Sequence, residues 1–405
     1  MPDGIVAHRP KRIHVITVRI HWFIISLRRE LRRLLHEGQS RYVVLATLGL
    51  VFCYVFFLTL MAEGQPERLP IAIVDKDGSY LSRRLCHEID ACQGVHVVGV
   101  YSSHTAARMA MQRQEVYAFL EIPAGTYNEV LSFTRPHLVL YSNNAYLLSG
   151  ALSYRTLATI SNLASGAVQR EVLRKKGLDE RQIMGLIQPI ELDTHLVGNP
   201  TANYQPYVLT TMLPGMLGLF VLLVTVYMVG RERRDGTLSE WLGENTLAAL
   251  CGKMAPYTLW FGTLGVLGNI VLFGWCGFEL HGSFVLVAVF TLLLVLAMQA
   301  AAVFLAGVIP DAHLSTCFAA IYGTLAFTMS GFSYPVTSMP PALQGFSLLF
   351  PLRHYYLAVS RISLFGAGFE LCYWQAAALV LFLAVGLVGA LLLRQQARRA
   401  VESEK

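Results

Sequence analysis

Six long apolar stretches constrain this chain more than any other feature of its sequence. Each holds at least 20 residues with almost no charge, and they cover residues 42–62, 207–229, 254–275, 284–308, 314–334 and 373–393. A bilayer core about 30 Å thick takes about 20 helical residues to cross. Because lipid offers the backbone no hydrogen-bond partner, a spanning segment of this composition must be helical. The pattern predicts an α-helical polytopic membrane protein with six transmembrane helices.

The distribution of charge supports a membrane protein and argues against a nucleic-acid surface. Charged residues make up 14% of the chain, below the roughly 25% of an ordinary soluble domain. Residues 1–41 hold nine Lys and Arg against three acidic residues, whereas the polar insertion at 63–206 holds thirteen against fourteen. The basic excess thus lies beside membrane ends, which is the positive-inside pattern.

The same rule orients the chain, because short cytoplasmic flanks of spans are enriched in Lys and Arg. The first span then runs outward, the insertion lies outside, and the tail returns to the cytoplasm. We expect a bacterial inner-membrane protein with both termini in the cytoplasm. The predicted domains are a cytoplasmic lead (1–41), a first transmembrane helix (42–62), a periplasmic α/β domain (63–206), a five-helix remainder (207–393) and a cytoplasmic tail (394–405).

The insertion shows an alternation of strand-like and helical patterns. Short apolar, β-branched runs lie near residues 71–75, 95–101, 116–122 and 137–141, and a long helical pattern follows from about 145 to 176. Strands that alternate with helices are typical of parallel βαβ units. We therefore expect an extracytoplasmic α/β domain between the first and second spans, with parallel strands.

The lead is predicted to contain an amphipathic helix over residues 14–37. Apolar residues recur at close to helical spacing, at Ile20, Ile24, Leu27, Leu31, Leu34 and Leu35. The charged face, expected toward headgroups or water, comprises Arg29, Glu30, Arg33, His36 and Glu37. Such a helix is either a connector that braces the bundle against a partner or a plain membrane anchor, and the sequence leaves both open.

The sequence carries no motif for catalysis or for nucleotide binding. The phosphate-binding loop G-x-x-x-x-G-K-[ST] is absent, and so are H-E-x-x-H and C-x-x-C. Asp75 and Asp77 follow a strand, where a turn is the commoner reason for Asp-x-Asp-Gly. The apolar stretches hold essentially no ionisable residue, which argues against a proton- or sodium-driven carrier. We expect no enzyme, no metal and no cofactor in this chain.

Two cysteines of the insertion, Cys86 and Cys92, are six residues apart. In an oxidising compartment such a pair can form a disulfide. Two buried thiols are the alternative, and the sequence leaves both open.

The loop after the second span, at 230–253, has features of a docking segment. Thr237 and Glu240 fit a capping box, which predicts a helix that begins there. Leu238, Trp241 and Leu242 then form an apolar ridge at helical spacing. A short helix of this kind suits a groove on a cytoplasmic partner. A basic loop with an interfacial helix is the alternative.

A second irregular segment follows the fifth apolar stretch. Gly331, Pro335, Pro340 and Pro341 would break a helix. Broken backbone at membrane depth is tolerated only where it is buried in protein or lines a cavity. We expect a re-entrant hairpin near the outer leaflet, with 342–352 as its returning arm. A simple outer loop with an interfacial helix is the alternative.

These two segments resemble signatures of one transporter family. The run Arg231-Glu232-Arg233, followed by Gly236-Thr237-Leu238, is similar to the E-R-E-x-G-T-L-E-x-L signature of type-2 ABC transporter permeases. Ser330 to Gln344, with its Met339-Pro340-Pro341 step, resembles the family's G-x-x-x-P-x-x-x-M-P-x-x-L-Q pattern. The one-large-loop layout resembles the family's multidrug-export-like branch. The first acidic position of the first signature is Arg231 here.

The resemblance implies a subunit that works as a dimer, with itself or a close paralogue, beside a cytoplasmic ATPase that binds ATP and Mg. It implies outward transport of a drug-like, lipid-like or other amphipathic substrate, and leaves open whether a periplasmic adaptor protein docks. The hairpin residues would be Gly331, Pro335, Met339, Pro340 and Pro341. The residues of the ATPase-coupling helix would be Arg231, Glu232, Arg233, Gly236, Thr237, Leu238, Glu240 and Trp241.

A second class of function fits the same layout. The chain could be a membrane-anchored envelope scaffold or receptor, with a periplasmic domain that binds a ligand. Membrane lipid is a partner in either case, and no nucleic acid is expected.

Overall fold

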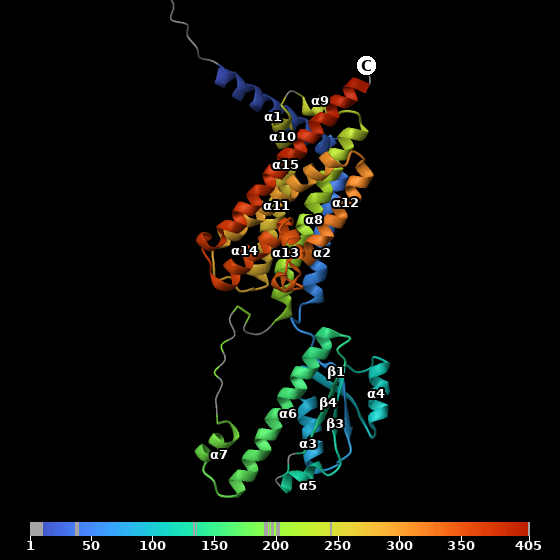
Figure 1. The fold of residues 1–405 in the computed structure, drawn as a ribbon, viewed down its shortest axis with the longest axis vertical. Coiled ribbons are helices and arrows are strands. Elements are labelled where there is room, and N and C mark those ends of the chain that lie inside the picture. Colours follow the sequence, from blue (N-terminus) through green and yellow to red (C-terminus); the bar gives the residue numbers. More distant parts are fainter. Residues whose placement is uncertain are drawn as a thin grey trace, which may run out of the picture. The chain divides into compact units, whose positions relative to one another are not determined.

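A computed structural model of the chain describes residues 11–36, 40–132, 134, 136–189, 193, 195, 198–199, 203–243 and 245–403. The chain forms two compact units (Figure 1). The helical unit comprises residues 1–62 and 196–405, and the α/β unit comprises residues 63–195.

The elements of the helical unit are mostly long helices. They are α1 (Lys11–His36), α2 (Ser40–Leu60), α8 (Tyr204–Arg234), α9 (Leu238–Leu242), α10 (Thr246–Asn269), the π-helix η1 (Ile270–Trp275), α11 (Phe284–Val308), α12 (Ala312–Met329), the 3₁₀ turn η2 (Val336–Ser338), α13 (Pro341–Ser347), α14 (Pro351–Phe365) and α15 (Phe369–Ser403).

Five of these helices are long and apolar enough to cross a membrane. They are α2, α8, α10 with η1, α11 and α15, and they coincide, to within two residues at the end of the first, with five of the six predicted segments. The remaining segment, predicted at 314–334, forms the 18-residue helix α12, which is not among the five. This helix stops at Met329 because Gly331 takes a left-handed backbone conformation with φ of +94°. The count of six spans therefore stays a prediction.

Helices α8 and α11 form the centre of the helical unit. Their buried side chains, among them Leu217, Val221, Phe290 and Leu294, lie in one large apolar cluster. By contrast α2 and α15 expose large apolar side chains on their outer faces, such as Phe52 and Leu381. Apolar surface of this extent is unfavourable in water and suits the lipid of a bilayer.

Helices α11 and α15 approach each other backbone to backbone. A Cβ added at Gly389 would lie 2.5 Å from Phe304 Cα, and one added at Gly307 would lie 2.6 Å from the Gly389 carbonyl oxygen. A Cβ at Gly386 would lie 2.8 Å from Ala300 Cβ. Small residues are what allow helices to pack this closely in membranes.

The α/β unit is built on a four-stranded sheet. Its elements are β1 (Leu69–Asp75), α3 (Tyr80–Asp90), β2 (Val95–Tyr101), α4 (His104–Gln112), β3 (Ala118–Ile122), α5 (Thr126–Leu131), β4 (Val139–Ser142), α6 (Leu147–Lys175) and α7 (Glu180–Ile187). The strand order is β2-β1-β3-β4. Leu85 of α3 and Leu157 of α6 pack on one face of the sheet, and Ala107 of α4 packs on the other.

The prediction of parallel strands is right for three strands and wrong for the fourth. Strand β1 pairs in parallel with β2 and β3, but β4 runs antiparallel to β3. A parallel return needs a helix that crosses a face of the sheet. The six-residue α5 buries only Thr126, so the chain turns back at the end of β3 instead of crossing the sheet.

The turn predicted at Asp75 and Asp77 is confirmed. Asp75 Oδ1 accepts hydrogen bonds from the backbone N–H groups of Asp77 at 3.0 Å and Gly78 at 2.9 Å. Its Oδ2 accepts from the Ser82 hydroxyl at 2.8 Å. All of these contacts shape the β1–α3 connection.

Cys86 and Cys92 are free thiols in the structure, and both pack partly buried against the sheet core. Burial raises the pKa of the Cys86 thiol to about 11. Because the thiolate is the reactive form of cysteine, Cys86 is poorly reactive at neutral pH.

Candidate functional site

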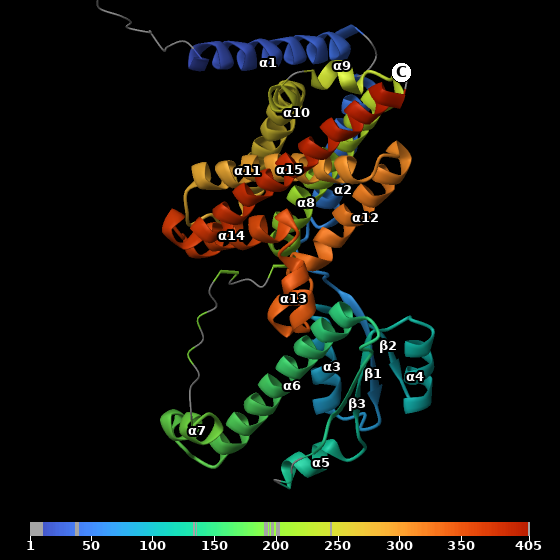
Figure 2. The same cartoon turned by 45° about the horizontal axis from the view of Figure 1, so that its top comes forward.

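The predicted coupling segment lies at one end of the helical unit, which we call the α9 end. Figures 1 and 2 show α1, α9 and the C-terminal part of α15 together there. Helix α8 has 31 residues, so at 1.5 Å per residue it is about 46 Å long. Its first residue, Tyr204, and its last, Arg234, are therefore at opposite ends of the unit.

A buried cluster of four charged side chains, which we call the ion cluster, joins α1, α8 and α10 at this end. Glu232 of α8 is 0% exposed, Glu30 of α1 and Lys253 of α10 are each 1% exposed, and Arg33 of α1 is 8% exposed. Lys253 Nζ lies 2.6 Å from Glu30 Oε2 and 2.8 Å from Glu232 Oε1. The Arg33 guanidinium donates to Glu232 Oε1.

Neutral donors complete the ion cluster. The Tyr257 hydroxyl donates to Glu30, and the Thr237 hydroxyl donates to Glu232. Arg29 lies at the rim, with Nη2 3.6 Å from Glu232 Oε2. Charges removed from water are costly unless they are paired and hydrogen-bonded, and here both carboxylates have cationic and neutral partners. The arrangement fixes the end of α8 to α1 and α10.

Trp241 ties α9 to the same place. Its indole N–H donates to Ser26 Oγ at 3.2 Å, and the Ser26 hydroxyl donates to the Ala249 carbonyl at 2.7 Å. Lys253 Nζ lies 5.1 Å from the centre of the Trp241 ring, within the range of a cation–π contact. Helix α9 is thereby held between α1 and α10.

The predicted helix start at Thr237 is confirmed, but the capping box is wrong. Thr237 is the N-cap of α9, and its side chain makes no capping hydrogen bond. Its ψ is 6°, outside the extended region that a capping side chain needs. The hydroxyl donates to Glu232 instead, because a buried carboxylate left without a donor is costly.

The apolar ridge of Leu238, Trp241 and Leu242 faces the chain's own core. These side chains are 8%, 3% and 1% exposed, in a cluster with residues of α10, α11 and α15. The ridge therefore stabilises the position of α9 and is not open to a partner in this structure. Among the described residues 231–242, the exposed ones are Arg234, Asp235, Gly236 and Glu240.

The orientation expected for the lead helix is wrong for two charged residues. Glu30 and Arg33 face the bundle and are buried, whereas Ile20, Ile24 and Leu35 are exposed. The carboxylate of Glu30 needs Lys253 as its partner, which turns this face inward. His36 and Glu37 lie where side chains fall outside the described residues.

Arg233 has a role that its motif position did not predict. Its guanidinium donates to the carbonyls of Ile309 at 3.0 Å and Pro310 at 3.1 Å, and also to Ala306 and the Gln396 side chain. It thus satisfies carbonyl groups at the C-terminal end of α11 that have no partner within the helix. Arg231 pairs with Asp235 at 3.3 Å.

The predicted hairpin residues form an irregular connection between α12 and α14. Met339 is 7% exposed, Pro340 precedes α13 and Pro341 begins it. The Gln344 side chain donates to the Met339 carbonyl at 2.8 Å. The stretch expected as the returning arm, 342–352, holds most of α13, which ends at Ser347, and the start of α14, which begins at Pro351.

Lys253 of the ion cluster and its neutral neighbour Tyr257 were not predicted from the sequence. The available signal was Lys253, a lone cation directly before an apolar stretch. The positive-inside rule accounts for a lysine at this position equally well, without any buried partner. Only the packing of α1 against α10 brings Glu30 to it.

The fold and the site define a polytopic helical membrane protein with a fixed loop at one end. A model of the ABC-2 family transporter proteins matches residues 41–392, and the chain therefore belongs to this family. It is 24% identical over 356 residues to a protein of Escherichia coli K12 described as "Probable multidrug ABC transporter permease YbhR". The match covers 85% of this chain and 90% of that protein, and the protein of Escherichia coli O157:H7 with the same description matches equally.

Proposed function

We propose that this chain is the membrane-spanning permease subunit of an ATP-binding cassette exporter. A separate ATPase subunit would bind at the α9 end and supply the energy. The observation that carries the proposal is the ion cluster, because it joins the family's signature loop firmly to α1, α8 and α10. A force applied to this loop would move three long helices together.

We further propose that the α9 end faces the cytoplasm of a bacterial inner membrane, with six spans and both termini inside. The exposed Arg28, Arg32 and Arg234 support this orientation, since cytoplasmic flanks carry basic residues. The end of α2 packs near the start of α8, so residues 63–195 are connected to the helical unit at the end opposite to the α9 end, which we propose faces the outside.

The cargo and the assembly are also proposals. The description of the relatives as multidrug permeases supports efflux of a drug-like, lipid-like or other amphipathic substrate. A second permease subunit, identical or closely related, would complete the route, and a periplasmic adaptor is a further candidate partner. ATP and Mg would be bound by the ATPase.

Reconstitution tests the division of labour between two chains. The affinity-tagged chain should co-purify with an ATPase from its native membrane. Vesicles that hold the permease alone should hydrolyse ATP no faster than empty vesicles, whereas vesicles that hold the complex should hydrolyse it. ATP hydrolysis by the lone chain, or purification without any ATPase, would count against the proposal and favour an envelope scaffold or receptor.

A further inference from the structure

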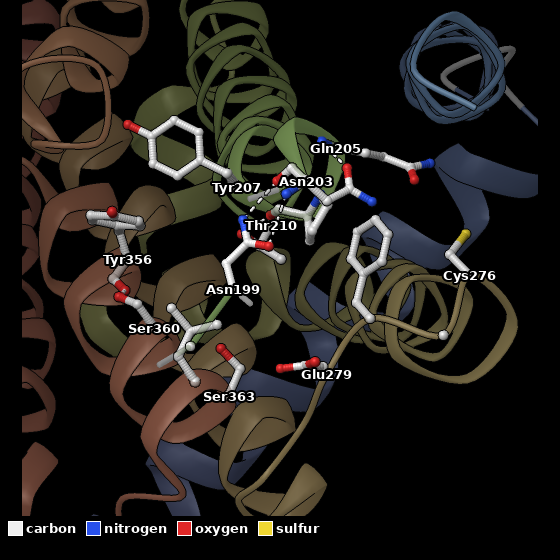
Figure 3. Close-up of a pocket in the computed structure, with 15 residues that line it drawn as sticks. Asn199, Asn203, Gln205, Tyr207, Thr210, Cys276, Glu279, Tyr356, Ser360 and Ser363 are labelled. Carbon is white, nitrogen blue, oxygen red and sulfur yellow. Dashed lines mark hydrogen bonds between the residues drawn. The ribbon is translucent and has the colours of Figure 1, made fainter. Parts of the chain in front are cut away.

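A cavity lies at the end of the helical unit opposite to the α9 end. It has a volume of about 210 Å³ and is enclosed by the start of α8, the turn after η1, the middle of α14 and residues 198–199 (Figure 3). Tyr207 lines it, 25 residues before Glu232 on the same helix. At 1.5 Å per residue the cavity is about 38 Å from the ion cluster along α8.

The lining of the cavity has a negative charge and no described positive one. Glu279 is the one charged side chain among the fifteen described residues that line it. Its carboxylate is exposed and makes no hydrogen bond or ion pair with the described residues. In Figure 3 it lies beside Ser363, below Asn199.

The polar groups around Glu279 are mostly engaged with the backbone. The Asn203 side chain accepts from the Gln205 N–H at 2.8 Å, and the Asn199 side chain donates to the Asn203 carbonyl at 2.7 Å. The Ser363 hydroxyl donates to the Val359 carbonyl at 2.8 Å. These groups shape the wall, and they leave the carboxylate as the strongest point of attraction for a ligand.

Aromatic rings supply the rest of the recognition surface. Tyr207, Phe278 and Tyr356 all line the cavity. The face of an aromatic ring attracts a cation within about 6 Å of its centre, with about 0.5–2 kcal/mol. Gly277 leaves open space, since a Cβ added there would meet nothing within 4 Å.

The size of the cavity limits the ligand. Pockets for whole drug-sized molecules have volumes of about 300–1,000 Å³, so 210 Å³ suits a headgroup. We propose that this cavity binds a small organic cation, such as a quaternary ammonium group, between the Glu279 carboxylate and the ring of Tyr356. The inference rests on the proposed function only for the step from binding to transport.

Calorimetric titration of choline into the purified full-length chain tests the site. The wild type should bind choline saturably, and 3,3-dimethylbutan-1-ol, its uncharged isostere, at least about tenfold more weakly. Glu279→Gln should weaken choline binding about tenfold, which corresponds to about 1.4 kcal/mol. Tyr356→Leu should weaken it several-fold, whereas Tyr356→Phe, which keeps the ring, should retain it.

The matched control is Glu370→Gln, which removes an exposed carboxylate at the same end of the unit, outside the cavity. It should bind choline like the wild type. Equal affinities of wild type and Glu279→Gln, equal affinities for choline and its isostere, or no saturable binding to the wild type would each overturn the proposal. Binding needs no ATPase, so its failure would leave the permease assignment standing.

Two sources of such a headgroup can be separated with nanodiscs. Equal choline affinity in phosphatidylglycerol and phosphatidylcholine nanodiscs supports a soluble cation as the ligand. Binding that is present in phosphatidylglycerol but lost in phosphatidylcholine supports a lipid headgroup that occupies the same cavity. Absence of binding in both nanodiscs contradicts the proposed site.

Discussion

Replacement of Lys253 with methionine should lower the free energy of unfolding of the helical unit by about 3–5 kcal/mol. Lys253 is buried between Glu30 and Glu232, at 2.6 and 2.8 Å. Methionine fills similar space without charge, so Glu30 and Glu232 would each lose a close cationic contact. Denaturant titration in detergent, followed by tryptophan fluorescence, measures the loss, because Trp241 lies 5.1 Å from the Lys253 ammonium.

The control for this change is Arg32→Met on the exposed side of α1, which should alter stability by no more than about 0.5 kcal/mol. Addition of Glu30→Gln to the Lys253→Met variant should recover part of the loss, since it removes one of the two buried negative charges that Lys253 contacts. A Lys253→Met protein as stable as Arg32→Met would show that the ion cluster does not hold this end together.

Replacement of Gly389 with alanine should destabilise the bundle by about 1–3 kcal/mol, a large effect for one methyl group. The new Cβ would lie 2.5 Å from Phe304 Cα and 2.6 Å from Phe304 N. These are backbone atoms that no rotamer change can move, so α11 and α15 would have to separate. Thermal unfolding of the purified variant in detergent measures the loss.

Gly345→Ala provides a matched comparison, because a Cβ at this helical position would meet nothing within 4 Å. It should be neutral or stabilising by about 0.4–1 kcal/mol. If both alanine variants unfold like the wild type, the close packing of α11 and α15 is not as described.

The sequence predicted the elements that depend on local pattern. Apolar runs of about 20 residues have few alternatives to a helix in lipid, so α2, α8, α10, α11 and α15 were all expected. Strand β1 and the turn at Asp75 also depend on local pattern, because a β-branched run and an Asp-x-Asp-Gly step act through neighbouring residues.

Features that depend on distant partners were not predictable. The capping role expected of Thr237 failed because Glu232, five residues earlier, competes for its hydroxyl. Glu30 was placed toward water because its partner Lys253 is 223 residues away. The antiparallel direction of β4 likewise follows from the small buried surface of α5. The hydrophobic periodicity of a six-residue segment does not reveal how much of it will be buried.

The motif located the candidate site but did not say which way its side chains face. A signature of residue types fits a ridge that docks on a partner as well as a ridge that packs inward. Leu238 and Trp241 pack inward, so the surface that we propose for an ATPase is formed by exposed residues around Asp235 and Glu240. Their only described ion pairs are exposed ones, with Arg231 at 3.3 Å and Arg29 at 3.9 Å, which contribute little to stability.

Transport by the complex of this chain with the proposed ATPase, measured after charge reversal at Asp235 and Glu240, tests most directly whether energy enters at the α9 end. The Asp235→Lys, Glu240→Lys variant should fold like the wild type and lose ATP-driven transport by at least about tenfold. A partner surface complementary to the two carboxylates would then face charges of its own sign, which costs several kcal/mol at an interface. Glu370→Lys, at the opposite end, should transport normally. Wild-type transport and ATPase co-purification by the double variant would contradict the account.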